Sequence, residues 1–354
     1  MKPKELNFIK ELESKKIKLA AVITELHFIH NSDLEDRYGE TVRQNYVEDT
    51  VSHFNYLIEA VKLNSTELFN DYLEWAWHML EARNTPGEEL ISGIGFMQSA
   101  IFDHIEGPGS ERANTILDCG IDHLKKLQPR TKTYLLKSNP LYEEAAEYLR
   151  LLLDAKRSDA AELIDELVER GESVQNIYEY IFQSTQYEIG ALWHSNKITV
   201  ANEHYCTAAT QLIMSRLYPI IFSNRKHGLK LVACSVSSEL HEMGIRMVSD
   251  FFEMDGWHTY YMGSNMPDAD LLQSIRDHEA DLLAISVTLP IHIGKVKTLI
   301  DDIRGRDEFK NLKIMAGGYP FGIIPDLQQH IGADATAASA GEAVKTANGL
   351  VSLK

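Results

Sequence analysis

The chain has 354 residues, more than one compact core usually covers, so we expect two or three domains. Its formal net charge is −17, which would repel a phosphate backbone, and the sequence holds no basic recognition helix or Lys/Arg cluster, so we expect no direct binding to nucleic acid. No run of about 18 apolar residues suggests a membrane span. The opening "MKPKELNFIKELESKK" lacks the apolar core of a secretory signal, so we expect a cytoplasmic protein. Cys119, Cys206 and Cys234 are too widely spaced to indicate a disulfide framework or a zinc site.

The first 130 residues predict a helical accessory domain. Apolar residues recur at three- and four-residue intervals from about residue 6 to 127, as in "VEDTVSHFNYLIEAVKL". Ser65-Thr66-Glu67 reads as the cap of one helix. "NTPGEEL" (84–90) and "EGPGSER" (106–112) read as breaks between helices, because each contains Pro and Gly.

A second helical set follows a Lys-rich connection near "KLQPRTKTYLLKSNP". The periodicity predicts helices over 141–155, 158–170, 173–189 and 199–222. Four helices with short links are typical of a four-helix bundle, and we expect such a domain over residues 140–225.

The pattern changes at Lys230. Short apolar runs, "KLVACSV", "WHTYYMG", "DLLAISVT" and "LKIMAGG", alternate with helical stretches, with about five strand–helix alternations in all. This alternation predicts a doubly wound, Rossmann-like parallel sheet over residues 228–354, with ligands bound at the carboxyl ends of the strands. The chain is therefore expected to be a multidomain α and α/β protein.

Three motifs follow successive predicted strands. The loop after the first strand reads "SSELHEMGIRM" and contains Glu239-x-His241-x-x-Gly244. The later motifs are Ser286 and Thr288 in "ISVTL" and the pair Gly317-Gly318 in "MAGGYPF". In this order they resemble the Asp/Glu-x-His-x-x-Gly, Ser-x-Leu and Gly-Gly motifs of cobalamin-binding domains, although the leucine stands one place late. A dinucleotide site is set aside, since the first loop has no Gly-x-Gly-x-x-Gly.

The resemblance implies a role for each motif. His241 would bind cobalt as the lower axial ligand, and Glu239 would hold its other ring nitrogen and raise its basicity. Gly244 would let the loop approach the corrin, while Gly317 and Gly318 would leave room for the nucleotide tail of the cofactor.

The helical segment before the sheet contains "LWHSNKITVANEHYC", with Trp193 spaced Trp-x9-Glu-His from Glu203-His204. This spacing resembles the cap of light-sensing cobalamin proteins. The resemblance implies that Trp193 lies over the upper axial group, that Glu203 and His204 line the pocket around an adenosyl ligand, and that His194 takes the upper cobalt position after light breaks the cobalt–carbon bond. The alternative is that Trp193 is a core residue and the Glu-His pair a solvated helix face.

These residues lead to the prediction of a photoreceptor, a sensor in preference to an enzyme, that binds adenosylcobalamin. Its output would pass through a homo-oligomer or a protein signalling partner. An indole over the cobalt would obstruct methyl or radical transfer. In addition, "PIHIG" (290–294) lacks the serine that ends the carboxylate–histidine relay of corrinoid proteins such as methionine synthase. The alternatives are a corrinoid methyl carrier of a methyltransferase system, whose helical cap moves aside, and a store for cobalamin.

The N-terminal segment resembles the accessory domain of stand-alone cobalamin photoreceptors, including photocobilins, which implies a bilin such as biliverdin as a second chromophore. The hypothesis assigns six residues to the bilin. Cationic side chains for the propionates are Arg37, Arg43 and His53, and rings for packing are Tyr38, Trp75 and Trp77. The alternative is that aromatic residues at helical spacing are simply core residues.

Overall fold

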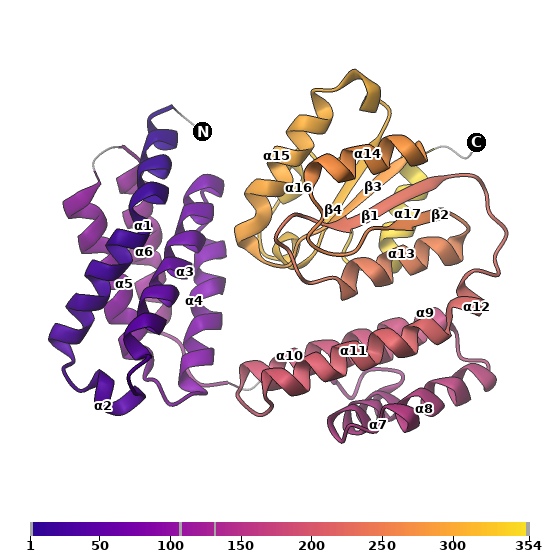
Figure 1. The fold of residues 1–354 in the computed structure, drawn as a ribbon, viewed down its shortest axis with the longest axis horizontal. Helices are drawn as coiled ribbons and strands as arrows, with labels where there is room; N and C mark the ends of the chain where they lie inside the picture. Colours follow the sequence, from indigo (N-terminus) through magenta and orange to yellow (C-terminus); the bar gives the residue numbers. More distant parts are fainter. Residues whose placement is uncertain (1–2, 106–107, 131, 352–354) are drawn as a thin grey trace. The chain divides into compact units, whose positions relative to one another are not determined.

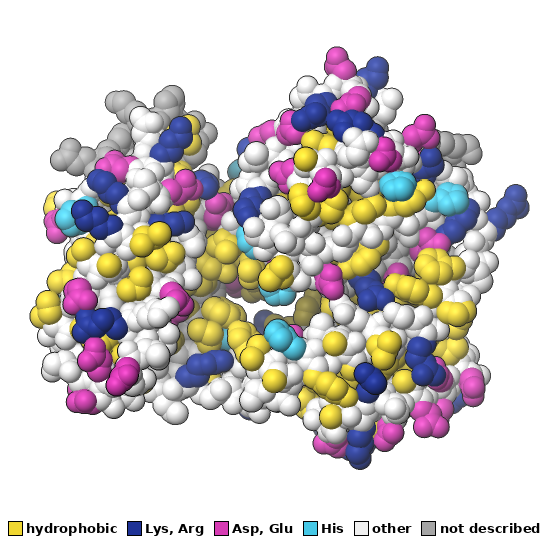
Figure 2. All heavy atoms as spheres, in the orientation of Figure 1, with side chains coloured by type: hydrophobic (Ala, Val, Ile, Leu, Met, Phe, Trp, Pro, Cys, Tyr) yellow, Lys and Arg dark blue, Asp and Glu magenta, His cyan; other side chains and the backbone are white. Residues whose placement is uncertain are grey.

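The computed structural model describes residues 3–105, 108–130 and 132–351, and residue contacts divide the chain into two compact units, 1–130 and 131–354 (Figure 1). Each unit is described by itself. Within the described ranges, no helix is both long and apolar enough to cross a membrane. Figure 2 shows Lys and Arg side chains scattered among Asp and Glu over the visible face.

The first unit is helical, as the periodicity predicted. Its helices are α1 (Pro3–His30), α2 (Leu34–Tyr38), α3 (Val42–Leu63), α4 (Thr66–Glu81), α5 (Gly87–His104) and α6 (Pro108–Leu124). Helix α1 packs against α3, α5 and α6, and α4 packs against α6. The predicted cap is confirmed, because the Ser65 hydroxyl accepts a hydrogen bond from the Leu68 N–H at the start of α4.

The second unit begins with helices. They are α7 (Tyr142–Leu153), α8 (Arg157–Glu169), α9 (Val174–Asn176), the π-helix η1 (Ile177–Gln183), α10 (Ser184–His194), α11 (Val200–Arg216) and α12 (Tyr218–Ile221). Two predicted boundaries were wrong. The third helical stretch continues past 189 to His194, and the fourth breaks after Arg216, where Pro219 lacks the N–H that a continuous helix needs.

A four-stranded parallel sheet follows, so the predicted sheet type is confirmed. Its strands are β1 (Lys230–Ser235), β2 (His258–Tyr261), β3 (Leu282–Ser286) and β4 (Lys313–Gly317), in the order β2-β1-β3-β4. The expectation of about five strands was too high for the described residues. Ala335 makes only an isolated bridge to Met315, since the chain there soon enters the next helix. Ser235 pairs with Ser286, and Ser286 with Gly317, so three strands end at one level.

Helices cover both faces of the sheet (Figure 1). The longer ones are α13 (Met243–Asp255), α14 (Asp268–His278), α15 (Ile293–Arg304) and α17 (Ala340–Leu350), with the short η2 (Pro290–His292), η3 (Asp307–Phe309), η4 (Tyr319–Gly322) and α16 (Leu327–Ile331) between them. Leu231 and Ala233 of β1 share a core with Phe252 of α13 and Ala343 of α17. Successive strand residues point to opposite faces, which gives α14 and α15 the other face.

Helix α13 also joins the sheet to the preceding helices. The buried Tyr178 hydroxyl of η1 donates a hydrogen bond of 2.8 Å to Asp250 Oδ2, and Arg246 Nη2 donates one of 3.0 Å to the Tyr218 hydroxyl. Burial raises the pKa of Asp250 to about 6, although the bond from Tyr178 opposes the shift. The folded protein therefore keeps the proton on this carboxyl group up to a higher pH than the unfolded chain does.

We predict that Asp250→Asn stabilises the protein near pH 7 and has little effect near pH 4. The raised folded-state pKa means that wild-type stability is lost as the pH rises from about 4 to about 6. The amide removes this loss, which is about 3 kcal/mol at 1.36 kcal/mol per pKa unit. Urea unfolding of the second unit between pH 4 and 8 measures the difference. The control is Asp277→Asn, on the exposed side of α14. An equal effect of Asp250→Asn at both pH values would contradict the prediction.

Candidate cofactor site

The loop after β1 brings Glu239 and His241 to the carboxyl edge of the sheet. Its backbone is fixed by hydrogen bonds at both ends: the Glu239 N–H donates to the Val236 carbonyl, and the Ser235 hydroxyl donates to the His241 carbonyl. The carbonyl of Glu239 accepts from the N–H of Asn265, after β2. The loop is therefore held from β1 and from the neighbouring strand.

The Glu239 carboxylate is the centre of this edge and is fully buried, with 0% exposure. Its Oε1 accepts the backbone N–H of His241 at 3.1 Å and the ring Nδ1 of His241 at 2.5 Å. Its Oε2 accepts the backbone N–H groups of Thr288 and Leu289, both at 2.9 Å, and lies 3.2 Å from Nδ1 of His292. Burial alone raises the pKa of Glu239, but these hydrogen bonds outweigh it and hold the pKa far below its usual value.

His241 presents its ring to solvent while its Nδ1 is tied down. The side chain is 56% exposed, and the hydrogen bond from Nδ1 to Glu239 raises the pKa of His241 against the opposing effect of burial. Glu203 of α11 raises it further through its charge, so the structure brings Glu203 within electrostatic range of His241. With Nδ1 occupied, Nε2 is the nitrogen left for a metal, and a carboxylate on the opposite nitrogen makes imidazole a stronger ligand.

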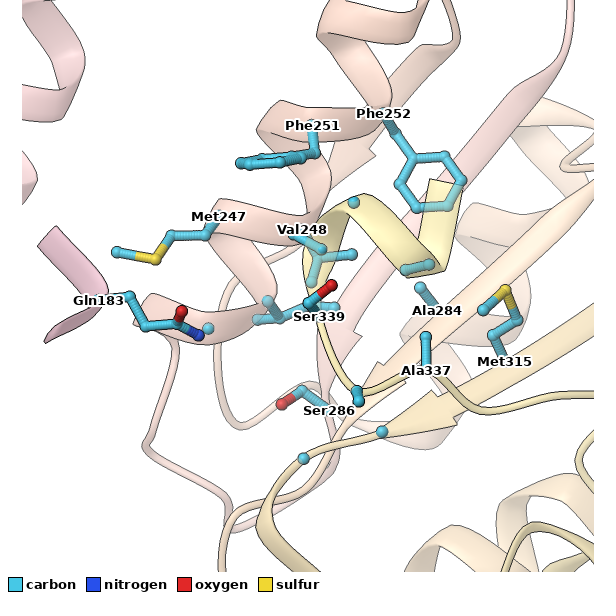
Figure 3. A pocket seen from close by; sticks show the side chains of 18 of the residues that line it. Gln183, Met247, Val248, Phe251, Phe252, Ala284, Ser286, Met315, Ala337 and Ser339 are labelled. Carbon is cyan, nitrogen blue, oxygen red and sulfur yellow. The ribbon is translucent and has the colours of Figure 1, made fainter. Parts of the chain in front are cut away.

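A cavity of about 160 Å³ lies between the strand ends and the surrounding helices. Its wall includes Ser286, Gly317 and Gly318, and Figure 3 shows Gln183 of η1 and Met247 of α13 around the same space. Most lining side chains are apolar or small, as ligand pockets usually are. Gly244 lies in the same wall, so four of the predicted residues line one cavity.

The glycines of the site have different roles. Gly318 has φ +116°, and a Cβ there would lie 2.0 Å from the Val287 carbonyl oxygen, so glycine is required by the fold. A Cβ on Gly317 would make only an ordinary contact, 3.7 Å from the Ala337 carbonyl. A Cβ on Gly244 would meet nothing within 4 Å, which leaves open space beside the first turn of α13.

The predicted cap residues lie on α10 and α11. Trp193 and His194 are half-buried at the end of α10. Glu203 is partly buried and lies 2.5 Å from Nδ1 of His204, whose side chain is 75% exposed. The two side chains thus form a hydrogen-bonded pair at the surface of α11, and the charge of Glu203 acts on His241.

The six residues considered for a bilin belong to separate groups in the first unit. Arg37 and Tyr38 both hydrogen-bond to Glu89, whereas His53 Nδ1 lies 2.7 Å from the Tyr72 hydroxyl. Arg43 forms ion pairs with two carboxylates, Glu25 and Glu35. Both guanidinium groups are therefore already paired with carboxylates. Trp77 is buried in the core, and Trp75 is 42% exposed.

His292 is the residue that sequence reasoning missed. The prediction looked for a serine in residues 290–294 and took the relay to end without one, but His292 hydrogen-bonds to Glu239 from that segment. A polar residue six positions after Ser286 was the available signal.

The fold and the buried carboxylate–histidine pair define an α/β protein that can offer an imidazole to a metal cofactor beside an apolar cavity. Two family models, both described as B12 binding domain, match this part of the chain, over residues 144–218 and 229–347. The chain is therefore a member of the cobalamin-binding proteins. The exposed His241 ring, the open space at Gly244 and the cavity fit such a group.

The proteins to which this chain is similar include corrinoid proteins. Dimethylamine corrinoid protein 1 of Methanosarcina acetivorans is 24% identical over 169 residues, which is 46% of this chain and 77% of that protein. Dimethylamine corrinoid protein 2 of the same organism is 24% identical over 213 residues, 58% of this chain and 96% of that protein. The structure of the Methanosarcina barkeri monomethylamine corrinoid protein shares the fold, with a TM-score of 0.53 and 21% identity, covering 60% of this chain and 100% of that one.

The photoreceptor prediction was wrong, because these relatives are corrinoid proteins of the methylamine type. The spacing from Trp193 to His204 reflects the geometry of two consecutive helices. It does not determine which reaction takes place at the cobalt. The steric objection also fails, since a helical cap can move aside to admit a partner.

We predict that Glu239→Gln lowers the pKa of His241 toward its usual value of about 6.5. The neutral amide removes the charge that raises the pKa of the imidazole. The ring proton resonances of His241, followed by NMR against pH in protein without cofactor, measure the shift. His330 on α16 is the control, and at any given pH its resonances should be the same in the variant and in the wild type. An unchanged His241 titration would contradict the prediction.

We predict opposite outcomes for two alanine substitutions. Gly318→Ala should destabilise the fold by several kcal/mol, because its Cβ would overlap the Val287 carbonyl and its φ is unfavourable. Gly244→Ala should leave the urea midpoint nearly unchanged yet weaken cobalamin binding, because its Cβ enters the open space beside the first turn of α13. Urea unfolding and equilibrium dialysis with hydroxocobalamin separate the two effects. Wild-type affinity of Gly244→Ala would show that the corrin does not approach this loop.

Proposed function

We propose that this protein is a corrinoid methyl carrier of a methyltransferase system, with His241 as the lower axial ligand of cobalt. The observation that carries the proposal is the buried Glu239 carboxylate 2.5 Å from Nδ1 of an exposed imidazole, in a chain related to dimethylamine corrinoid proteins. Bound cobalamin would supply a cobalt centre that takes up and gives up a methyl group. A separate methyltransferase would deliver that group, and the relatives' names favour a methylated amine as its source.

The lower side of the site is assigned to the loops of the sheet. Glu239 keeps the Nδ1 proton of His241 in place, so Nε2 stays available for the metal. The nucleotide tail of the cofactor would occupy the cavity beside Ser286 and Gly317, and Gly244 would face the corrin. Thr288 contributes its backbone N–H to Glu239.

The upper side is assigned to residues 140–225, with α7, α8, the α9–α10 stretch and α11 acting as a four-helix cap. Trp193 and His194 at the end of α10, and Glu203 and His204 on α11, would face the upper surface of the corrin. There they would exclude water between transfers. Because methyl donors and acceptors must reach the cobalt, this cap has to move when a methyltransferase docks.

The carried group is proposed to be methyl in place of the adenosyl group expected from sequence. Biliverdin binding by residues 1–130 is not part of the proposal and stays a prediction, as do the cytoplasmic location and a homo-oligomeric state. The store for cobalamin is kept as the competing function. A store would release the whole cofactor, whereas a carrier keeps the cofactor and passes on the methyl group.

We predict that protein loaded with ¹³C-methylcobalamin passes the label to a thiol when a corrinoid-dependent thiol methyltransferase is added, while cobalt stays bound. NMR of the methylated thiol and cobalt analysis after gel filtration measure the two quantities. His241→Ala should still take up some cofactor but transfer the label more slowly, because the axial ligand is gone. His330→Ala, at an exposed position on α16, is the matched histidine control.

Two outcomes would overturn the proposal. Release of intact methylcobalamin together with its label would indicate a store. Retention of both cofactor and label, under conditions in which free methylcobalamin is demethylated by the same enzyme, would mean that the protein does not present its methyl group to partners.

A further inference from the structure

Two imidazoles share the single carboxylate of Glu239. His241, after β1, lies on Oε1, and His292, in η2 after β3, lies on Oε2. The side chain of His241 is mostly open to solvent, whereas that of His292 is only 9% exposed. One buried charge therefore connects an imidazole at the cofactor face with a second imidazole inside the protein.

The two oxygens of Glu239 are held by different loops. Oε1 is held entirely by the β1–α13 loop, through the backbone and ring of His241. Oε2 is held entirely by the segment after β3, through the N–H groups of Thr288 and Leu289 and the ring of His292. Three donors on one oxygen fix the rotation of the carboxylate about its last bond, and with it the direction of the other oxygen.

His292 is the only one of these three donors on Oε2 that belongs to a side chain. It is also oriented by its surroundings, because Pro290 begins η2 and the His292 N–H bonds back to the Leu289 carbonyl. The ring thus reaches Glu239 from a short, rigid turn. A donor in this place restrains the carboxylate without contacting the cofactor itself.

We propose that His292 is a positioning residue: its Nδ1–H fixes Oε2 of Glu239, so that Oε1 is aimed at His241 and keeps His241 on the cobalt. The inference rests on the proposed role of His241 as axial ligand. It replaces the view that the relay ends at Glu239, and it assigns the end of the relay to a second histidine.

The test compares His292→Ala, His292→Asn and His292→Gln in the full chain. The amide nitrogen of Asn lies where Nδ1 of histidine lies, while that of Gln lies near the position of Nε2. His292→Asn therefore retains a donor to Glu239. His292→Gln has a similar size and polarity, but its N–H donor lies away from the position of Nδ1.

Each protein is loaded with hydroxocobalamin and reduced to the cobalt(II) state. Electron paramagnetic resonance then reports whether a nitrogen is the axial ligand. Uniform ¹⁵N labelling of the protein changes the splitting only when that nitrogen comes from the protein.

In wild type and His292→Asn we expect a protein nitrogen on cobalt. In His292→Ala and His292→Gln the ratio of histidine-bound to histidine-free cobalt should fall about tenfold, as the loss of one hydrogen bond to a charged group predicts. If His292→Ala does not fold, the comparison of His292→Asn with His292→Gln still tests the proposal, because the two variants differ in the position of the N–H donor. Equal ratios in Asn and Gln variants would overturn the proposal.

The same spectra separate this inference from the proposed function. A histidine-bound wild type with no difference between the Asn and Gln variants removes the role of His292 alone. A wild type with no protein nitrogen on cobalt removes both His241 as ligand and His292 as its positioning residue. Normal ligation together with failed methyl transfer removes the carrier function and leaves the role of His292 standing.

Discussion

The buried negative charge of Glu239 is the constraint on which the site depends. A carboxylate removed from water is tolerated only when donors replace the water on both oxygens. Those donors come from the segments after β1 and after β3, two strands that are hydrogen-bonded neighbours in the sheet. Parallel pairing with Ser235 opposite Ser286 brings the two segments to the same level. The strand register, the satisfied charge and the orientation of His241 are therefore parts of one arrangement.

At a second buried acid, Asp250, the balance between burial and hydrogen bonding is different. Asp250 has its Tyr178 partner, but burial dominates and its proton is held more tightly than in water. Glu239 is richly supplied with donors, which hold its pKa far below the usual value, whereas Asp250 has fewer donors and its pKa is raised to about 6. The first arrangement suits a group that must support a metal ligand. The second lies where the π-helical segment meets α13, between the preceding helices and the sheet.

Sequence reasoning reached the sheet because its strands are short apolar runs separated by helical stretches, a pattern that local residues determine. It placed Glu239 and His241 at a strand end for the same reason. It missed His292, because a contact between segments more than 50 residues apart depends on strand order and register, which no local pattern states. It also inferred a light-sensing function from Trp193 and the Glu203-His204 pair. Their spacing indicates only two consecutive helices joined by a short turn, a geometry that proteins with different chemistry can share.

The π-helix from Ile177 to Gln183 has a consequence for the face on which the cap residues lie. A π segment takes in extra residues relative to an α-helix, and each residue turns an α-helix by about 100°. The direction of Trp193 and His194 is therefore set partly by a wide turn ten residues earlier, beside the cavity. Loss of one residue from that turn would rotate the end of α10 to another side of the helix while leaving its sequence intact. The identity of the residues proposed to face the corrin thus depends on the length of a segment that need not contact the corrin itself.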